Sequence, residues 1–104
     1  MAGTMVEPTR ELPVVADVDV VVAGCGPGGL AAAVAAARQG ARTLLIERYG
    51  FLGGLATAGM VAPILGHTAH DSSRPIVEGL LREMTDRMHA LGGSVSWEES
   101  LPRW

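Results

Sequence analysis

Apolar positions form short continuous runs in the first half of the chain. Two runs, Val20–Ala23 and Thr43–Ile46, are typical of strands buried on both faces of a parallel sheet. Residues 27–39 between them are rich in alanine and begin with a proline, which the first turn of a helix tolerates. Gly40 stands where helices commonly end. The pattern predicts a β-α-β unit with a right-handed crossover.

The second half of the chain predicts one irregular segment and one amphipathic helix. Residues 49–66 are apolar but contain five glycines and a proline, so we expect an irregular segment folded against another part, with a helical turn near residues 56–59. Residues 74–91 then show a helical repeat that Ser72 or Ser73 can cap. Its apolar positions are Ile76, Leu80, Leu81, Met84, Met88 and Leu91, and the positions expected to face water are Arg82, Glu83, Asp86 and Arg87.

The two ends of the chain have no periodic pattern. Residues 1–16 carry two prolines and scattered charges, which indicates an extended, flexible leader. The last residues, 94–104, predict no regular element.

Charge and composition exclude several classes of partner. The net charge is −3, with eight arginines and no lysine, so we expect no basic patch and no nucleic-acid partner. Two uncharged runs, residues 20–37 and 49–66, are near the minimum length of a membrane span, but their glycines and prolines argue against insertion. A single cysteine and the lack of a secretory signal pattern favour a cytoplasmic protein.

The turn between the first strand and its helix matches the pattern G-x-G-x-x-G. Gly24 allows a sharp exit from the strand, Gly26 allows a pyrophosphate to approach the backbone, and Gly29 allows the helix to approach the strand. The N-terminal end of a helix attracts phosphate through its free N–H groups and its dipole. We therefore predict a dinucleotide site, with Pro27 and Gly28 in the same turn.

An acid ends the second strand. Glu47 lies 18 residues after Gly29, close to the spacing at which a carboxylate binds ribose hydroxyls. A carboxylate there repels a 2′-phosphate, so NADP is disfavoured. Arg48 is a candidate for a phosphate contact or an ordinary surface arginine.

These motifs carry a resemblance to a known family. The run DVVVAGCGPGGLAAAVAAARQGARTLLIERYGFLGGLATAGMV resembles the start of the FAD-dependent oxidoreductases with a glutathione-reductase-type Rossmann domain, and the similarity extends over residues 17–93. In that family the glycine turn holds the FAD pyrophosphate, the acid holds the adenosine ribose, and a Gly-Gly-x-x-Thr segment approaches the cofactor again. By position, the resemblance implies FAD contacts at Gly24, Gly26, Pro27, Gly28, Gly29, Glu47, Arg48, Gly53, Gly54, Leu55, Ala56 and Thr57.

The length departs from that family, whose members have several hundred residues. We therefore expect residues 17–104 to be the N-terminal part of a truncated FAD-binding domain, with an incomplete Rossmann-like α/β fold. The intact enzyme would transfer hydride between flavin and a small-molecule substrate that the sequence does not identify. Two alternatives remain open: an NAD-binding dehydrogenase fragment, and a non-catalytic chain that needs a partner to complete its fold.

The sequence names no catalytic residue. Cys25 occupies the variable position of the turn and is expected to be a buried filler and not a nucleophile. His67 is a candidate to lie near the flavin, whereas His67 and His70 do not form a convincing metal site. His89 is expected on the solvated surface of the helix.

Overall fold

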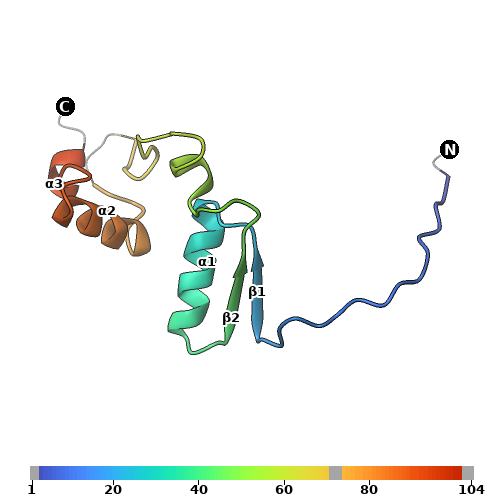
Figure 1. Cartoon of the computed structure of the whole chain (residues 1–104). Coiled ribbons are helices and arrows are strands. Elements are labelled where there is room, and N and C mark those ends of the chain that lie inside the picture. Colours follow the sequence, from blue (N-terminus) through green and yellow to red (C-terminus); the bar gives the residue numbers. More distant parts are fainter. Residues whose placement is uncertain (1–2, 71–73, 102–104) are drawn as a thin grey trace.

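The computed structural model describes residues 3–70 and 74–101. Its elements, in chain order, are β1 (Val20–Ala23), α1 (Pro27–Arg38), β2 (Thr43–Ile46), the 3₁₀ helix η1 (Gly54–Ala56), α2 (Leu80–Ala90) and α3 (Trp97–Ser100) (Figure 1).

The β1-α1-β2 unit has the predicted order, both strands have the predicted bounds, and α1 ends at Arg38, one residue before the predicted end. Strands β1 and β2 pair in parallel, with Val20 opposite Thr43 and Ala23 opposite Ile46. The beginnings of the strands are held by Arg42, whose backbone N–H and guanidinium donate to the Asp19 carboxylate at 2.8 and 3.0 Å. The hydrogen bonds to Arg42 lower the pKa of Asp19. The structure is therefore a small α/β fold consistent with part of a Rossmann-like unit.

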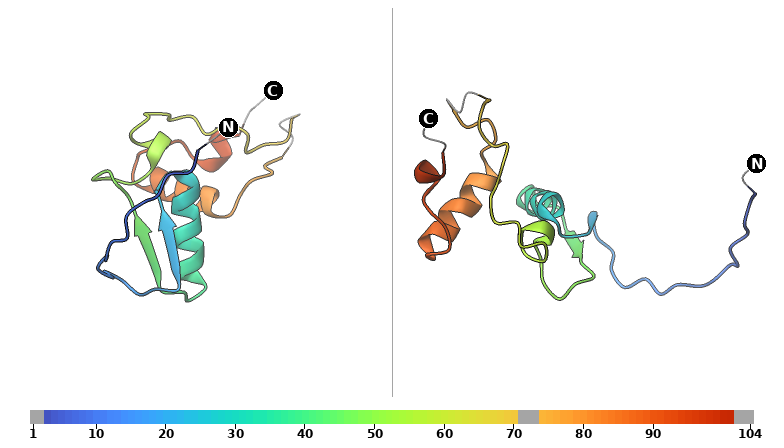
Figure 2. Two further views of the ribbon diagram at one scale, coloured as in Figure 1. Left: turned by 90° about the vertical axis from the view of Figure 1, so that its right-hand side faces the viewer. Right: turned by 90° about the horizontal axis from the view of Figure 1, so that it is seen from above.

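Helix α1 covers one face of the two-stranded sheet (Figures 1 and 2). Ala33 of this helix is buried, while Val21 and Ile46 on the strands are 56% and 50% exposed. The expectation that both faces of the strands are covered is therefore wrong for the described residues. The opposite face is exposed because no second helix of the described chain packs on it.

Two glycines shape the ends of α1. Gly24 has φ +93° directly after β1, and Gly40 has φ +86° directly after the helix, both in the left-handed region. Gly29 has a different role, because a Cβ on it would overlap the Gly24 carbonyl oxygen. The third glycine of the motif thus permits the close contact of helix and strand that the sequence predicts.

Helix α2 begins at Leu80, so the predicted start at residue 74 is wrong. Backbone hydrogen bonds hold residues 74–77 against an earlier segment, with Ile76 N–H donating to the His67 carbonyl oxygen at 2.8 Å. Gly79, with φ +64°, then turns the chain into the helix. The capping candidates Ser72 and Ser73 lie outside the described residues.

The apolar positions of α2 are only partly covered, and one of its acids pairs with α1. Met84 and Met88 are 37% and 43% exposed. The Arg38 guanidinium of α1 donates to both carboxylate oxygens of Glu83, at 2.7 and 2.8 Å. Glu83 therefore joins the two helices, where a water-facing position was expected.

Residues 97–100 form α3, which the sequence analysis missed. Ser96 caps it reciprocally: its hydroxyl accepts from the Glu99 N–H, and the Glu99 carboxylate accepts from the Ser96 N–H. This is the S-x-x-E capping box, a signal present in the sequence. It positions Trp97, which is only 3% exposed.

The chain extends over 60 × 41 × 25 Å with a radius of gyration of 18.9 Å. A compact domain of this length would have a radius of gyration of about 13 Å, so this chain is more extended than a compact domain. Residues 3–18 contain no helix or strand and run away from the sheet (Figures 1 and 2); the flexibility of the leader at residues 1–16 stays a prediction, and residues 1–2 lie outside the described part. Within residues 3–70 and 74–101, no helix is long and apolar enough to cross a membrane.

Candidate functional site

The glycine turn joins three parts of the chain through backbone hydrogen bonds. Gly24 N–H donates to the Ile46 carbonyl oxygen at 2.7 Å, which continues the strand pairing into the turn. Cys25 is fully buried, its N–H donates to Glu47, and its carbonyl oxygen accepts from Gly53 N–H at 2.8 Å. The burial of Cys25 agrees with the filler role expected for it.

The turn has an open side at the N-terminus of α1. A Cβ on Gly26 or on Gly28 would meet no protein atom within 4 Å. Gly26 has φ −70° and ψ −179°, an extended conformation that any residue adopts, so the backbone does not require glycine there. In the described part of the chain, the N–H groups of Gly26 and Gly28 donate to no backbone acceptor outside the helix. Bare glycines with free N–H groups at a helix N-terminus fit a pyrophosphate.

Glu47 lies beside this turn and is tied to it. Its Oε2 accepts from the Cys25 N–H at 2.7 Å, and its Oε1 accepts from the N–H groups of Arg48 and Tyr49 at 2.8 and 3.1 Å. These bonds lower the pKa of Glu47, and the bond from Cys25 has the largest effect. The side chain is therefore a carboxylate at neutral pH. A carboxylate has about four lone-pair positions, so Oε2 keeps acceptor capacity for a ribose hydroxyl.

The Gly-Gly-x-x-Thr segment packs directly on the glycine turn. A Cβ on Gly54 would stand 2.8 Å from the Gly26 Cα, and Gly53 has φ +111°. The Thr57 hydroxyl donates to the Leu52 carbonyl oxygen at 2.6 Å and closes this segment on itself. Two glycine motifs separated by more than 20 residues thus meet in one place.

The other predicted site residues lie at the edge of this arrangement. Leu55 is 66% exposed, and Ala56 and Thr57 are also exposed. Arg48 is exposed, and its guanidinium donates to the Tyr49 hydroxyl at 2.9 Å and lies 4.8 Å from the centre of the Tyr49 ring. The pairing with Tyr49 therefore does not distinguish between the two interpretations of Arg48, an ordinary surface arginine and a phosphate contact.

Comparison with known families decides what this glycine turn belongs to. Residues 19–103 match the model of a family described as FAD dependent oxidoreductase. The chain belongs to this family. FAD is accordingly its cofactor class, and the expectation of an FAD-dependent oxidoreductase is confirmed at the level of the family.

Curated relatives match over a shorter stretch. Proteins named soluble pyridine nucleotide transhydrogenase from Salmonella typhimurium and Salmonella typhi are 54% identical over 41 residues. The aligned stretch is 39% of this chain and 9% of each relative, so the chain spans only a small part of their length. No solved structure matches the chain.

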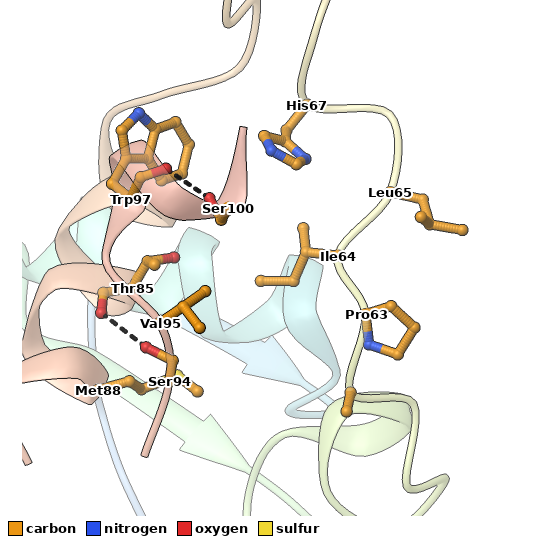
Figure 3. A pocket seen from close by; sticks show the side chains of 11 residues that line it. Pro63, Ile64, Leu65, His67, Thr85, Met88, Ser94, Val95, Trp97 and Ser100 are labelled. Atoms are coloured by element: carbon orange, nitrogen blue, oxygen red, sulfur yellow. Dashed lines mark hydrogen bonds between the residues drawn. The ribbon is translucent and has the colours of Figure 1, made fainter. Parts of the chain in front are cut away.

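Two cavities lie beyond the glycine turn of this family member. The first, of about 500 Å³, reaches Pro27, Leu55 and Ala56 and so adjoins both glycine motifs. The second, of about 380 Å³, is lined by α2, α3 and the segment before them and contains His67 and Trp97 (Figure 3). Pro63, Ile64 and Leu65 line both cavities, so they form the wall between the two.

The histidines differ in their surroundings. His67 is 9% exposed, and neither of its ring nitrogens has a hydrogen-bond partner. His70 is exposed, and His89 is exposed with its Nδ1 3.0 Å from the Ser94 carbonyl oxygen. Among the described residues, no group of three or more His, Cys, Asp or Glu side chains is arranged to hold a metal ion.

Sequence reasoning missed how the parts of the site are connected. The Cys25 backbone, which links Glu47 to Gly53, has no side-chain signal in the sequence. The burial of His67 against Trp97, at a ring distance of 5.4 Å, was also missed, although the capping box before Trp97 could have indicated α3.

Proposed function

We propose that this chain supplies the adenosine-diphosphate-binding part of the FAD site in a longer FAD-dependent oxidoreductase. The observation that carries the proposal is the open side of Gly26 and Gly28, at a helix N-terminus and beside the tethered carboxylate of Glu47. FAD supplies the hydride-transfer chemistry when it is bound.

Each motif has a separate role in this proposal. The N–H groups of Gly26, Gly28 and Gly29 face the pyrophosphate. Gly24, whose N–H bonds to Ile46, and Pro27, which has no N–H, shape the turn around it. Glu47 accepts a hydrogen bond from the adenosine ribose through the free capacity of Oε2. The segment at Gly53, Gly54, Leu55, Ala56 and Thr57 supports the turn from behind and approaches the cofactor from its exposed end.

The small core of the chain bears on whether it can be active alone. Two strands and one covered sheet face give little core, and in the described residues only Cys25, Ala33 and Trp97 are buried apolar side chains. We therefore expect these 104 residues alone to be inactive. The proposed enzyme is cytoplasmic, acts on a small-molecule substrate, and has neither nucleic acid nor membrane as a partner. The net charge of −3 supports the absence of a nucleic-acid partner.

An NAD-binding dehydrogenase fragment is the main competing function. It would be favoured by a glycine-rich segment remote from the nucleotide turn. Instead, Gly54 touches Gly26 and Gly53 bonds to Cys25, which supports the proposal that the segment belongs to the same site. That contact, together with the family, favours FAD. A non-catalytic chain that needs a partner remains compatible with the exposed apolar residues.

Titration of the isotopically labelled chain with ADP, followed by backbone amide NMR, tests the proposal at the low affinity expected of a partial site. The expected result is a shift of the amides of residues 24–29 and 47–49 with ADP and with FAD, and a much smaller shift with adenosine, which lacks the pyrophosphate. Gly26→Val should abolish these shifts, whereas Gly50→Val should not, although both positions are open in the structure. Equal responses of the two variants would reject the assignment of the turn. Equal responses to NAD and FAD at residues 53–57 would reject the FAD preference.

A further inference from the structure

The cavity that contains His67 is a second candidate site, distinct from the glycine turn. Its volume of about 380 Å³ is within the range of about 300–1,000 Å³ that is usual for small-molecule pockets. It lies between the 62–67 segment on one side and α2 and α3 on the other. Figure 3 shows Ile64 and His67 directed toward the space between them, while Leu65 points away from it.

Two polar groups at this cavity lack partners. His67 is more than nine-tenths buried, and neither Nδ1 nor Nε2 has a hydrogen bond within the described chain. The Nε1 of Trp97 is also buried without an acceptor. A buried polar group without a partner costs free energy, so a group that fills the cavity and pairs with His67 would bind favourably.

Backbone hydrogen bonds and an aromatic neighbour position His67. The His67 carbonyl oxygen accepts from the N–H groups of Ile76 and Val77 at 2.8 and 3.2 Å. The ring is tilted by 56° against Trp97, and Trp97 is itself held by the capped α3 helix and by Arg82, which lies 5.7 Å from its ring centre. The two backbone bonds therefore fix the main chain of His67, and Trp97 packs against its ring, before any ligand arrives.

The remaining lining defines the class of ligand. None of the lining side chains is Asp, Glu, Lys or Arg, and most are apolar, such as Ile64, Leu65, Met88 and Val95. The hydroxyls of Thr85, Ser94 and Ser100 already donate to carbonyl oxygens of the chain. A charged ligand would find no opposite charge among these lining side chains to offset any hydration that it loses.

We propose that this cavity binds a small, neutral, largely apolar molecule whose single hydroxyl group pairs with the imidazole of His67. A hydroxyl both donates and accepts, so it satisfies the ring in either neutral tautomer. The apolar body of the ligand contacts the side chains of Ile64, Met88 and Val95.

Three probes of similar shape test the proposal: benzyl alcohol, toluene and benzoate. Trp97 is the reporter in a Trp104→Phe background, where it is the only tryptophan. Saturable changes in Trp97 emission are expected, with benzyl alcohol binding about two- to tenfold more tightly than toluene, the range of one net hydrogen bond. Benzoate is expected to bind more weakly than both.

A His67→Phe variant keeps the ring and removes the hydrogen-bonding atoms. It should still bind toluene but lose the preference for benzyl alcohol, as expected for a site that discriminates by a buried polar group. Retained preference in a variant with unchanged helical circular dichroism would overturn the proposal, as would tighter binding of benzoate or no saturable binding of any probe.

Histidine side-chain NMR gives a second measurement without altering His67. Benzyl alcohol should shift the ring nitrogens of His67 and leave those of His70 and His89 unchanged. Equal shifts at all three histidines would reject a defined site even if the His67→Phe variant failed to fold. Both outcomes are independent of the ADP titration, so failure here and failure of the proposed FAD site are distinguishable.

Discussion

The Cys25 N–H donates to the Glu47 carboxylate at 2.7 Å across a separation of 22 residues. The bond joins the middle of the glycine turn to the end of the neighbouring strand, so the proposed pyrophosphate-binding and ribose-binding groups form one rigid unit. Such fixed geometry reduces the ordering that a bound nucleotide has to impose on the protein.

Replacement of Glu47 by glutamine should therefore weaken nucleotide binding. A glutamine amide cannot reproduce the set of three N–H donors that converge on the carboxylate, and it binds the ribose hydroxyl less strongly than a charged acceptor does. We expect the affinity for ADP to fall by about tenfold or more, as is typical for hydrogen bonds to charged groups. Titration with ADP, followed by backbone amide NMR, measures this affinity.

Glu78→Gln is the matched control, because Glu78 lies at the surface, where it pairs with Arg82 at 3.7 Å. It should leave the ADP affinity unchanged. If Glu47→Gln also leaves it unchanged, Glu47 does not contact the ribose.

Gly28→Ala and Gly29→Ala separate the two roles of the glycine turn. A Cβ at Gly29 would overlap the Gly24 carbonyl oxygen, so Gly29→Ala should destabilise the fold by about 1–3 kcal/mol. A Cβ at Gly28 meets open space, and alanine favours the helix by up to about 1 kcal/mol over glycine. Gly28→Ala should therefore keep or raise the thermal unfolding midpoint while it lowers the ADP affinity.

Thermal unfolding followed by circular dichroism, together with the ADP titration, measures both effects. A lower midpoint for Gly28→Ala, or an unchanged midpoint for Gly29→Ala, would contradict the roles assigned to these positions.

The link between Arg38 and Glu83 predicts a pH dependence. The hydrogen bonds from Arg38 lower the pKa of Glu83 from 4.5 to about 2. Because the folded pKa is below the unfolded one, the folded state binds fewer protons, and the stability from this pair is complete above pH 4.5. It is lost as the pH falls from 4.5 towards 2.

Glu83→Gln should flatten the stability profile in that acid range and leave its shape above pH 5 unchanged. Asp86→Asn, on the same helix with its acid 3.8 Å from Arg82, is the control and should retain the acid-range slope of the unaltered chain. Denaturant unfolding at several pH values measures the profiles. Parallel profiles for Glu83→Gln and the unaltered chain would show that Glu83 does not couple α1 to α2 in solution.

The parts of the site that follow from local sequence were predictable, and the parts that depend on tertiary contacts were not. The bounds of β1, α1 and β2 follow from apolar runs and from the glycines that interrupt them. The contact of Gly54 with Gly26 requires the fold of the chain between them, which no local pattern encodes. The resemblance to a family indicated that Gly53 and Gly54 approach the cofactor, but not that they support the turn.

The start of α2 shows how periodicity can mislead. Ile76 lies in phase with Leu80 and Met84, so the apolar repeat extended the expected helix to residue 74. In the structure, residues 74, 76 and 77 bond to residues 67 and 69 in a short antiparallel bridge, and Gly79 takes a left-handed φ. Gly79 is a local signal against a continuous helix, and a backbone pairing with the nearby residues 67–69 outweighed the repeat.

Ser96→Ala tests the helix that the sequence analysis missed. The Ser96 hydroxyl accepts from the Glu99 N–H at 3.2 Å, and loss of an N-terminal cap costs about 1 kcal/mol. Because α3 has only four residues, we expect the variant to lose much of this helix and to expose Trp97. In the Trp104→Phe background, the emission of Trp97 should then shift to longer wavelength, while Ser96→Asp, which keeps a capping oxygen, should preserve it. An unshifted emission in Ser96→Ala would show that packing against His67, and not the cap, holds Trp97 in place.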